Sequence, residues 1–329
     1  MMRLPFGDFK RVIDRELAKG KDVVVAYDSD ADGCSAAALL ILYVMEKTGN
    51  YPVDVISCFH DVDTKIKDKE GTVFVLDTMP RSVDKENVVV IDHHFVRRKP
   101  KNMKVFNPRL YDPSLYMSTS CLVYNILNMP KEAAWIAAIG IKADKSEETC
   151  EKIVKTAYRV TPEFKKLERK LVSLVSASKN MSDARIVVNS LIESYKMGGP
   201  SFFGKTPSSS KLKVIINRVR ENLMKALLKM ERVMETRSLL INMINSGYNL
   251  QGLIASKLLR LTPEKTIIVC NTGLSDDLVY GEVRTNSDKE HKRLFAILEE
   301  ICEDIGGHEK AFGFSIKKEN FKVFLEKIS

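Results

Sequence analysis

The sequence predicts an α/β fold with two domains, and three observations support this prediction. The chain has 329 residues, more than the roughly 100–200 residues of a typical single domain. In its first half, short apolar runs rich in β-branched residues alternate with helical patterns, which is typical of a mostly parallel sheet flanked by helices. After a segment rich in glycine, proline and serine at residues 197–210, a second α/β pattern begins.

The first domain is expected to hold five strands with helices between them. Helices are predicted at 35–47, where alanine is frequent, at about 120–127, and at 131–143 after Pro130. Apolar residues at helical spacing continue the helical pattern through 150–193. The predicted strands are residues 22–27, 53–58, 72–76, 87–91 and 104–106.

The second half begins with a loop at 197–210 and a long predicted helix at 212–241. The elements expected after it are strands at 266–270, 278–284 and 311–316, a helix at 289–303, a turn at the Gly-Gly pair 306–307, and a terminal helix. We therefore expect a first domain over 1–205, a helical connector over 206–241, and a smaller α/β domain over 242–329.

The composition indicates a folded protein without a membrane span. The longest apolar stretch, 36–45, is far shorter than the roughly 20 residues that a membrane helix needs, and residues 1–10 do not resemble a secretory signal, so a cytoplasmic protein is expected. Six cysteines without a CxxC pair argue against a zinc ribbon and a disulfide framework, and we expect reduced thiols. The net charge of +9 favours polyanionic partners, although many basic proteins bind no nucleic acid.

Three carboxylates, Asp28, Asp30 and Asp32, follow the first predicted strand directly. Residues two apart in extended backbone point to the same side, so these side chains are expected to converge at the carboxyl end of the strand. Carboxylates that close together repel one another unless cations neutralise them. A solvated loop or a calcium loop would show a similar pattern, but a calcium loop needs a Glu near its twelfth position, where this chain has an alanine-rich helix.

Further acids and two histidines end the next elements. Asp77 follows the strand at 72–76, and Asp92, His93 and His94 follow the strand at 87–91. Asp144 ends the apolar helix, where a carboxylate is unfavourable against the helix dipole unless a positive charge compensates it. Imidazole together with carboxylates suits Mn²⁺ or a similar ion, and these residues suffice for two ions that activate water for attack on phosphorus.

Taken in order, these motifs resemble those of the DHH phosphoesterase superfamily, which includes RecJ-type exonucleases, nanoRNases, cyclic-dinucleotide phosphodiesterases and family II pyrophosphatases. Residues 28–33 resemble its first motif in the DxDADG form, and Asp77, residues 92–94 and Asp144 resemble the second to fourth motifs. Residues 306–313, GGHEKAFG, resemble the signature of the substrate-binding domain associated with this family. The resemblance covers nearly the whole chain, and it implies an active site in the cleft between the two domains.

The resemblance also implies roles for individual residues. Asp28 and Asp30 would bind one ion, Asp32, His93 and Asp144 the other, and Asp77 would bridge the two. Asp92 would orient His93, and His94 would contact the scissile phosphate. In the second domain, Gly306, Gly307, His308 and Arg284 would hold the substrate phosphates. The cofactor implied is a pair of Mn²⁺ ions, with Mg²⁺ as the alternative.

The expected substrate is single-stranded DNA or RNA, cleaved as by a RecJ-like exonuclease. Short oligonucleotides or cyclic dinucleotides are the alternative substrates, and a scaffold subunit that associates with replication or repair proteins is the alternative without catalysis. Two departures from the family pattern bear on metal binding. Ala26 stands where many relatives carry a histidine, and residues 78–80 replace the usual continuation of the second motif toward glycine.

Overall fold

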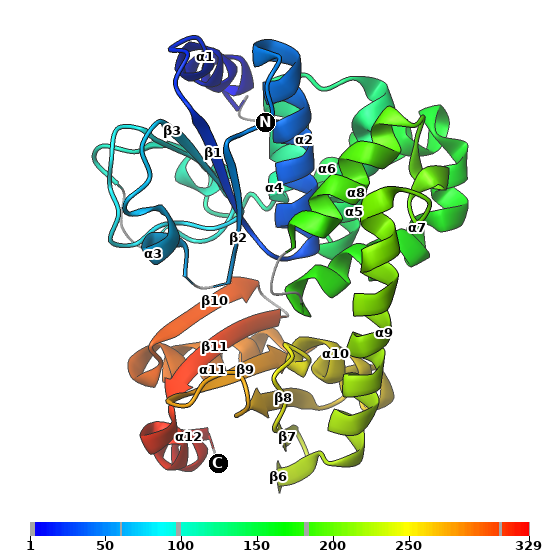
Figure 1. Ribbon diagram of the computed structural model, residues 1–329. Helices are drawn as coiled ribbons and strands as arrows, with labels where there is room; N and C mark the ends of the chain where they lie inside the picture. Colours follow the sequence, from blue (N-terminus) through cyan, green and yellow to red (C-terminus); the bar gives the residue numbers. More distant parts are fainter. Residues whose placement is uncertain (1–3, 60, 97–99, 181–183, 309–310, 329) are drawn as a thin grey trace. The chain divides into compact units, whose positions relative to one another are not determined.

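The computed structural model describes residues 4–59, 61–96, 100–180, 184–308 and 311–328, without the side chain of His308 (Figure 1). The chain divides into two compact units, Met1–Ile216 and Asn217–Ser329. The division falls inside helix α9 (Pro207–Leu228), which therefore belongs to both units.

The first unit is built on a five-stranded sheet in the order β2-β1-β3-β4-β5, with every neighbouring pair parallel (Figure 1). The residues of the central strands β3 and β4 are all buried, as expected for continuous apolar runs in a sheet covered on both faces. The predicted α/β fold with a mostly parallel sheet flanked by helices is confirmed. The strands are β1 (Val23–Asp28), β2 (Asp54–Cys58), β3 (Thr72–Leu76), β4 (Val88–Ile91) and β5 (Lys104–Phe106).

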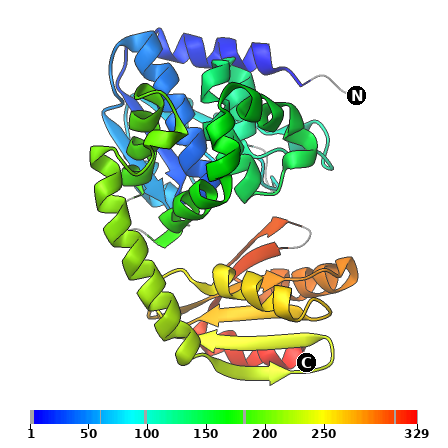
Figure 2. The ribbon, with the colours of Figure 1, turned by 90° about the vertical axis from the view of Figure 1, so that its right-hand side faces the viewer.

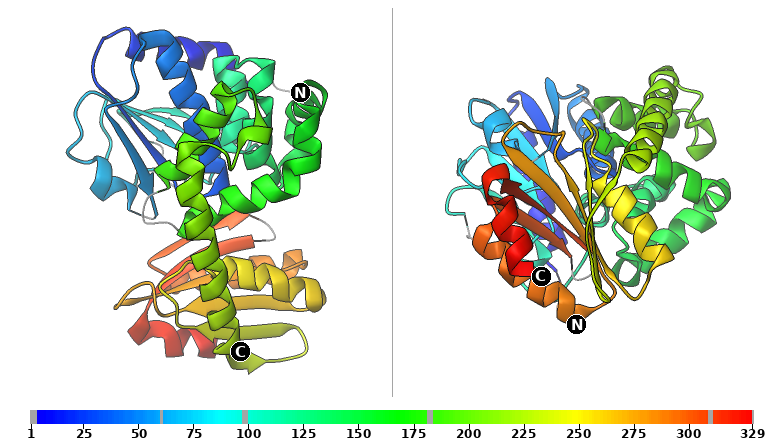
Figure 3. Two further views of the ribbon diagram at one scale, coloured as in Figure 1. Left: turned by 45° about the vertical axis from the view of Figure 1, so that its right-hand side comes forward. Right: turned by 90° about the horizontal axis from the view of Figure 1, so that it is seen from below.

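Two separate hydrophobic cores cover the faces of this sheet. Figure 3 shows the helices that lie beside the sheet. On one face, Val24 and Ala26 pack with Val62 and Ile66 of the short helix α3 (Val62–Ile66), so Ala26 is a core residue. The opposite face carries the larger core. Its helices are α1 (Phe6–Leu17), α2 (Ala31–Thr48), α4 (Thr119–Leu127), α5 (Ala134–Ala143), α6 (Glu147–Val160), α7 (Pro162–Ser176) and α8 (Arg185–Lys196). None of the described helices is long and apolar enough to cross a membrane.

The second unit holds a six-stranded mixed sheet in the order β10-β11-β9-β8-β7-β6 (Figure 2). Only β7 and β8 are parallel neighbours. One face packs on α11 (Asp288–Ile301) and α12 (Phe321–Ile328), and α10 (Gln251–Leu261) packs against β8 and β9. The strands are β6 (Glu231–Glu235), β7 (Leu239–Ile244), β8 (Thr266–Asn271), β9 (Leu278–Arg284), β10 (Asp304–His308) and β11 (Ala311–Lys317).

Two expectations for this unit are wrong. The helix predicted at 212–241 ends at Leu228, and strands β6 and β7 follow it. A short apolar run such as residues 239–244 fits either helix or strand by periodicity, and here neighbouring strands decide the outcome. The Gly-Gly pair is not a turn but lies inside β10, and a Cβ on Gly307 would come within 2.5 Å of the Ala311 carbonyl oxygen.

Cys121 of α4 and Cys150 of α6 form a disulfide, so the expectation of reduced cysteines is wrong for this pair. The two residues are 29 positions apart and meet because α4 and α6 both pack on the same core. Sequence spacing alone carries no sign of this contact, since no CxxC motif is present.

We predict that the double variant Cys121→Ser/Cys150→Ser lowers the free energy of unfolding of the first unit by about 3.6 kcal/mol, because the bond closes a loop of about 29 residues in the unfolded chain. Denaturant unfolding of wild type and variant, each with and without dithiothreitol, measures the effect. Wild type in dithiothreitol should approach the variant. If the reductant leaves wild type unchanged while the variant is destabilised, packing rather than the bond carries the stability.

Candidate metal centre

The carboxyl ends of three parallel strands bring together acids and histidines that are far apart in sequence. Asp28 is the last residue of β1, Asp77 follows β3, and His93 comes two residues after the end of β4. The Asp77 N–H donates to the carbonyl oxygen of Ile91 at 3.0 Å, which ties the end of β3 to the end of β4. Nε2 of His93 then lies 3.3 Å from Oδ1 of Asp77.

Two helices add carboxylates to the same place. Asp32 lies in the first turn of α2, and Asp144 ends α5. Nε2 of His93 lies 3.4 Å from Oδ2 of Asp144. Among the described residues, two groups have ligand atoms that all lie within 4.8 Å of one another: Asp77 with His93 and His94, and Asp32 with His93 and Asp144. Because His93 belongs to both, they form one contiguous cluster.

Asp30 caps α2 as well as lying beside this cluster. Its carboxylate accepts hydrogen bonds from the N–H groups of Asp32 at 2.8 Å and Gly33 at 3.0 Å, and Lys179 Nζ lies 3.3 Å from it. Burial works to raise the pKa of Asp30, but the attraction of Lys179 and the Gly33 N–H lower it to about 2. Asp30 is therefore an anion with a structural partner at each oxygen. Neither Asp30 nor Asp28 belongs to the two groups of close ligand atoms.

Asp32 is buried and held by the start of α4. Its carboxylate accepts hydrogen bonds from the N–H groups of Thr119 at 2.5 Å and Ser120 at 3.0 Å, and from the Ser120 hydroxyl. Gly140 of α5 makes room for this contact, since a Cβ there would come within 2.3 Å of both Asp32 Oδ1 and Ser120 Oγ. Burial and repulsion from Asp30 raise the pKa of Asp32 to about 7 despite these donors.

Asp77 and Asp144 are held in place in the same way. Asp77 has a φ of +60°, and its Oδ1 accepts a hydrogen bond from the Thr119 hydroxyl at 2.9 Å. The Tyr116 hydroxyl donates to Oδ2 of Asp144 at 3.1 Å. Burial and repulsion from Asp32 raise the pKa of both Asp77 and Asp144 well above the usual range.

This donor set fits a divalent cation. Several buried carboxylates that raise one another's pKa are stable as anions only beside positive charge, and one imidazole nitrogen lies among them. Burial, followed by the neighbouring His94, lowers the pKa of His93 to about 3, so its ring is neutral near pH 7 and suited to a metal ligand. Mixed oxygen and nitrogen donors favour Mn²⁺ or a similar ion over a calcium site built from oxygen alone.

Asp92 supports His94. Its Oδ1 lies 2.8 Å from Nδ1 of His94, and Nδ2 of Asn107 donates to its other oxygen at 3.3 Å. The family resemblance assigned Asp92 to His93, and this contact assigns it to His94 instead. Burial lowers the pKa of His94, but the Asp92 carboxylate outweighs it and raises the pKa to about 9. His93 is positioned through its backbone, because Nε of Arg109 donates to the His93 carbonyl oxygen at 2.8 Å.

Several of these supporting residues were missed from the sequence. Thr119, Ser120 and Tyr116 lie in a polar stretch at the start of α4 that carried no motif. Gly140 was the one signal in the sequence, because a glycine inside an apolar helix costs stability and usually marks a close packing contact.

The expected substrate residues lie in the second unit. His308 of β10 is opposite Ala311 of β11, which is opposite Arg284 of β9, so the three form one row. With about 4.8 Å between strands, the backbones of His308 and Arg284 are about 10 Å apart. Nη1 of Arg284 donates to Glu282 at 2.6 Å and its Nε donates to Ser256 at 3.3 Å.

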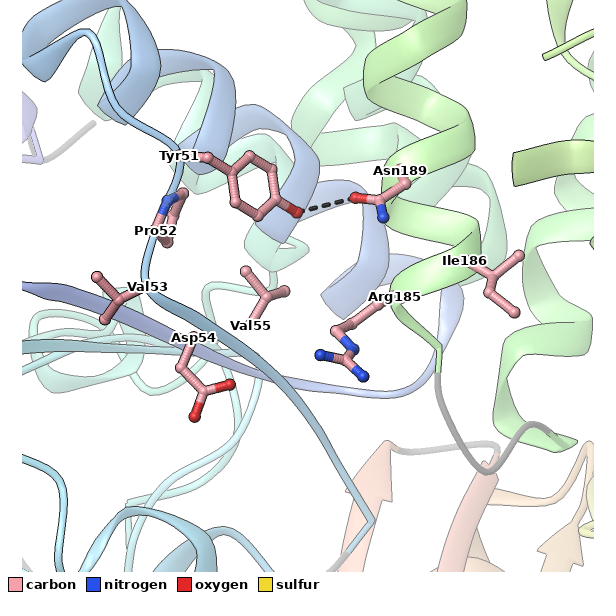
Figure 4. A pocket seen from close by; sticks show the side chains of 8 residues that line it. All are labelled: Tyr51, Pro52, Val53, Asp54, Val55, Arg185, Ile186 and Asn189. Carbon is pink, nitrogen blue, oxygen red and sulfur yellow. Dashed lines mark hydrogen bonds between the residues drawn. The ribbon is translucent and has the colours of Figure 1, made fainter. Parts of the chain in front are cut away.

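A surface pocket on the first unit lies away from all of these residues (Figure 4). It is formed where the chain enters β2, beside α8, and the Tyr51 hydroxyl donates to Oδ1 of Asn189 at 2.8 Å. Asp54 and Arg185 also line it. Since β2 runs parallel to β1, this pocket is at the amino end of the sheet, opposite the candidate metal centre.

Residues 22–157 match the DHH family, N-terminal domain. Among solved structures, the fold resembles exonuclease RecJ bound to manganese, with a TM-score of 0.65, 18% identity, and coverage of 99% of this chain and 94% of that one. RecJ from Thermus thermophilus gives a TM-score of 0.61 at 17% identity; the match covers 99% of this chain but only 54% of the Thermus protein. The DHH domain of a member of the s1p family of ribosomal proteins gives a TM-score of 0.70 at 15% identity, covering 98% and 89%. Among curated proteins, no sequence matches this chain.

We predict that the metal-free protein loses stability as the pH rises from about 6.5 to 8.5. The raised pKa values of Asp77, Asp144 and His94 mean that the folded state binds these protons more tightly than the unfolded state, so their stabilisation disappears as the pH rises through the folded-state values. The lowered pKa of His93 has the opposite effect, which levels off by about pH 7.5, where the histidine in the unfolded chain has lost its proton.

Melting curves in EDTA and in Mn²⁺ at both pH values test this. Mn²⁺ at 100 times its Kd should add about 2.7 kcal/mol of stability, with a larger gain at pH 8.5 because bound ligands must be deprotonated. Asp77→Asn, which suits the positive φ and cannot ionise, should raise the melting temperature in EDTA at pH 8.5 and lose most of the Mn²⁺ gain. A melting temperature that Mn²⁺ does not change at either pH would contradict a metal centre.

Proposed function

We propose that this chain, in which residues 22–157 match the DHH family, N-terminal domain, is a metal-dependent phosphodiesterase that hydrolyses single-stranded DNA or RNA as a RecJ-like exonuclease. The observation that carries this proposal is the cluster of Asp32, Asp77, His93 and Asp144 at the carboxyl ends of parallel strands. No nucleophilic serine or cysteine is needed, since the cluster is suited to hydrolysis by water.

The proposed ligands are Asp32, Asp77, His93 and Asp144, with Asp28 and Asp30 at the edge of the same cluster. Divalent ions held there would lower the pKa of water and neutralise the charge of the phosphate. Asp77 is proposed to bridge two ions, because it belongs to the ligand group that includes both histidines and is also repelled by Asp32, Asp30 and Asp144. The Thr119 hydroxyl and the N–H groups that surround Asp32 keep these carboxylates in position.

His94 is proposed to act on the phosphate itself. Asp92 fixes its ring through Nδ1 and raises its pKa to about 9, so the ring carries a proton at neutral pH. A protonated imidazole is a charge-assisted donor to a phosphate oxygen, where negative charge increases during in-line attack. His93, with a lowered pKa, has the opposite character and serves as a neutral ligand.

The second unit is proposed to hold the rest of the substrate. Gly306 and Gly307 lie in β10, the edge strand of the sheet, where part of the backbone has no neighbouring strand, and Arg284 lies in the same row of the sheet as His308. Arg284 is already bonded to Glu282, so a phosphate would have to compete with this carboxylate. Backbone donors and a guanidinium together are suited to phosphate oxygens.

Two other functions remain as alternatives. A pGpG-specific phosphodiesterase from Vibrio cholerae has a related fold (TM-score 0.50, 13% identity), which supports short oligonucleotides or dinucleotides as substrates. CDC45 from Entamoeba histolytica also has a related fold (TM-score 0.52, 11% identity), which supports a scaffold associated with replication proteins. At such identities the fold alone does not decide among these functions.

One assay separates the three functions. End-labelled DNA and RNA strands of about 20 nucleotides, and a dinucleotide, are incubated with the protein in Mn²⁺, in Ca²⁺ and in EDTA. A RecJ-like enzyme degrades the long strand with Mn²⁺ and is slower with Ca²⁺. An enzyme for short substrates prefers the dinucleotide, and a scaffold hydrolyses neither. Equal hydrolysis in EDTA would exclude a metallohydrolase.

We predict that Asp77→Ala reduces turnover of the preferred substrate by more than 100-fold, because two proposed ions share this ligand, while the fold stays intact. The matched control is Asp22→Asn, which removes an exposed carboxylate just before β1. It should leave turnover unchanged. If folded Asp77→Ala retains more than about a tenth of wild-type turnover, a loss below ~1.4 kcal/mol in the barrier, Asp77 does not bridge two ions.

We further predict that His308→Ala lowers turnover of oligonucleotides without changing the Mn²⁺-dependent gain in melting temperature, because this residue positions substrate rather than metal. Arg284→Ala should flatten the dependence of log Kd on log salt by up to about one unit for each phosphate that the arginine binds. Arg232→Ala, an exposed arginine in β6 of the same unit, is the control. If both variants behave like wild type across a salt series, the second unit does not hold the substrate.

A further inference from the structure

An exposed aromatic ring lies next to the candidate metal centre. Phe95 directly follows His94, and 59% of it is exposed to solvent. The chain has 14 phenylalanines, all within the described residues, and Phe95 is the only one of them that is largely exposed to solvent. Leaving a phenyl ring in water forgoes about 1.5–3 kcal/mol of stabilisation by burial, so its position beside the candidate metal centre calls for an explanation.

The ring of Phe95 is supported from one side. The guanidinium carbon of Arg109 lies 4.0 Å from the centre of the ring. Arg109 is itself anchored, because its Nε donates to the His93 carbonyl oxygen at 2.8 Å and its Nη1 donates to the Pro113 carbonyl oxygen at 3.2 Å. The orientation of the Phe95 ring is therefore linked to the backbone of a proposed metal ligand.

A stacked guanidinium covers one face of a phenyl ring, so the large exposed fraction of Phe95 means that its other face is open to solvent. An isolated surface cation–π pair of this kind contributes only about 0.5–1 kcal/mol. Such a pair explains why Arg109 lies over the ring but gives no reason for an apolar ring to stand beside His94. A second stacking partner on the open face would explain it.

A nucleobase fits this open face. Each base in a strand is joined to its own phosphate through a single sugar, so a ring adjacent to His94 is within reach of a base whose phosphate lies at the metal centre. Base stacking on an aromatic side chain contributes about 1–3 kcal/mol per base and tolerates any sequence, because every base has a flat π face. The net charge of +9 and the cation behind the ring are also compatible with a polyanionic strand.

We propose that Phe95, backed by Arg109, is the stacking platform for the base next to the scissile phosphate. This inference rests on the proposed phosphodiesterase function and adds a requirement to it: the substrate must carry a base at this position. Stacking forms in the bound substrate as well as in the transition state, so its loss raises KM and leaves kcat nearly unchanged. Larger purine bases gain more from the stack than pyrimidines.

The test compares Phe95→Ala with Phe95→Trp on two strands of equal length. One strand carries normal bases, and in the other every nucleotide is a tetrahydrofuran abasic analogue with the same phosphates. Phe95→Ala should raise KM for the normal strand at least about 5-fold, the effect of the weakest stacking. It should leave KM for the abasic strand unchanged, and Phe95→Trp should keep KM near that of wild type. Tyr51→Ala, which removes an exposed aromatic ring at the amino end of the sheet, is the control and should change neither KM.

The same four proteins are also tested for binding of both strands in Ca²⁺ by fluorescence anisotropy, so that a result does not depend on turnover. A 5-fold or larger loss of affinity in Phe95→Ala for the normal strand alone supports the platform. Equal losses on both strands would mean that Phe95 acts only by holding Arg109 and His93, and no loss on either would mean that the ring has no role; both results overturn the proposal. If wild type binds the normal strand but hydrolyses neither strand, the proposed function fails while the binding comparison still decides the role of Phe95.

Discussion

Repulsion among buried carboxylates is the constraint on which the rest of the first unit depends. Asp32, Asp77 and Asp144 surround one imidazole at the end of a parallel sheet, and burial together with their neighbours raises the pKa of each. A protein does not retain such a group for stability, because a buried anion without a cation destabilises the fold. A bound cation would offset this destabilisation. The surrounding elements hold the carboxylates in position before the cation binds.

The holding elements come from parts of the chain that are distant in sequence. The start of α4 directs the N–H groups of Thr119 and Ser120 at Asp32, which is 87 and 88 residues away, and the Thr119 hydroxyl contacts Asp77. Helix α5 approaches this contact closely only because residue 140 has no side chain. The positive end of α2 faces Asp30 at the same place. One helix start therefore fixes two proposed ligands, and a change in its packing would move both.

The parts of this structure that could be predicted from the sequence depend on local patterns. The five strands of the first unit appear as continuous apolar runs, and in a parallel sheet their carboxyl ends must share one edge, so acids after β1, β3 and β4 could be expected to meet. The contacts of Ser120 and Gly140 could not be predicted, because they depend on how α4 and α5 pack against α2 and against each other on one face of the sheet. For the same reason, the local pattern predicts helix up to residue 241, although neighbouring strands make residues 239–244 strand β7.

The assignment of Asp92 is a different case, because a local rule contained the answer. Side chains two positions apart in extended backbone point to the same side, which is consistent with the contact between Asp92 and His94, although the rings of His93 and His94 are also neighbours, with centroids 4.6 Å apart. The same rule holds less well for Asp28, Asp30 and Asp32, because Asp30 caps α2 and Asp32 is already helical. The alternation of side chains predicts their direction only where the backbone is extended. A helix-capping residue such as Asp30 marks the end of the extended segment. The two neighbouring imidazoles differ because His93 is buried beside His94, whereas His94 is paired with Asp92, and these surroundings lower the pKa of His93 to about 3 and raise that of His94 to about 9.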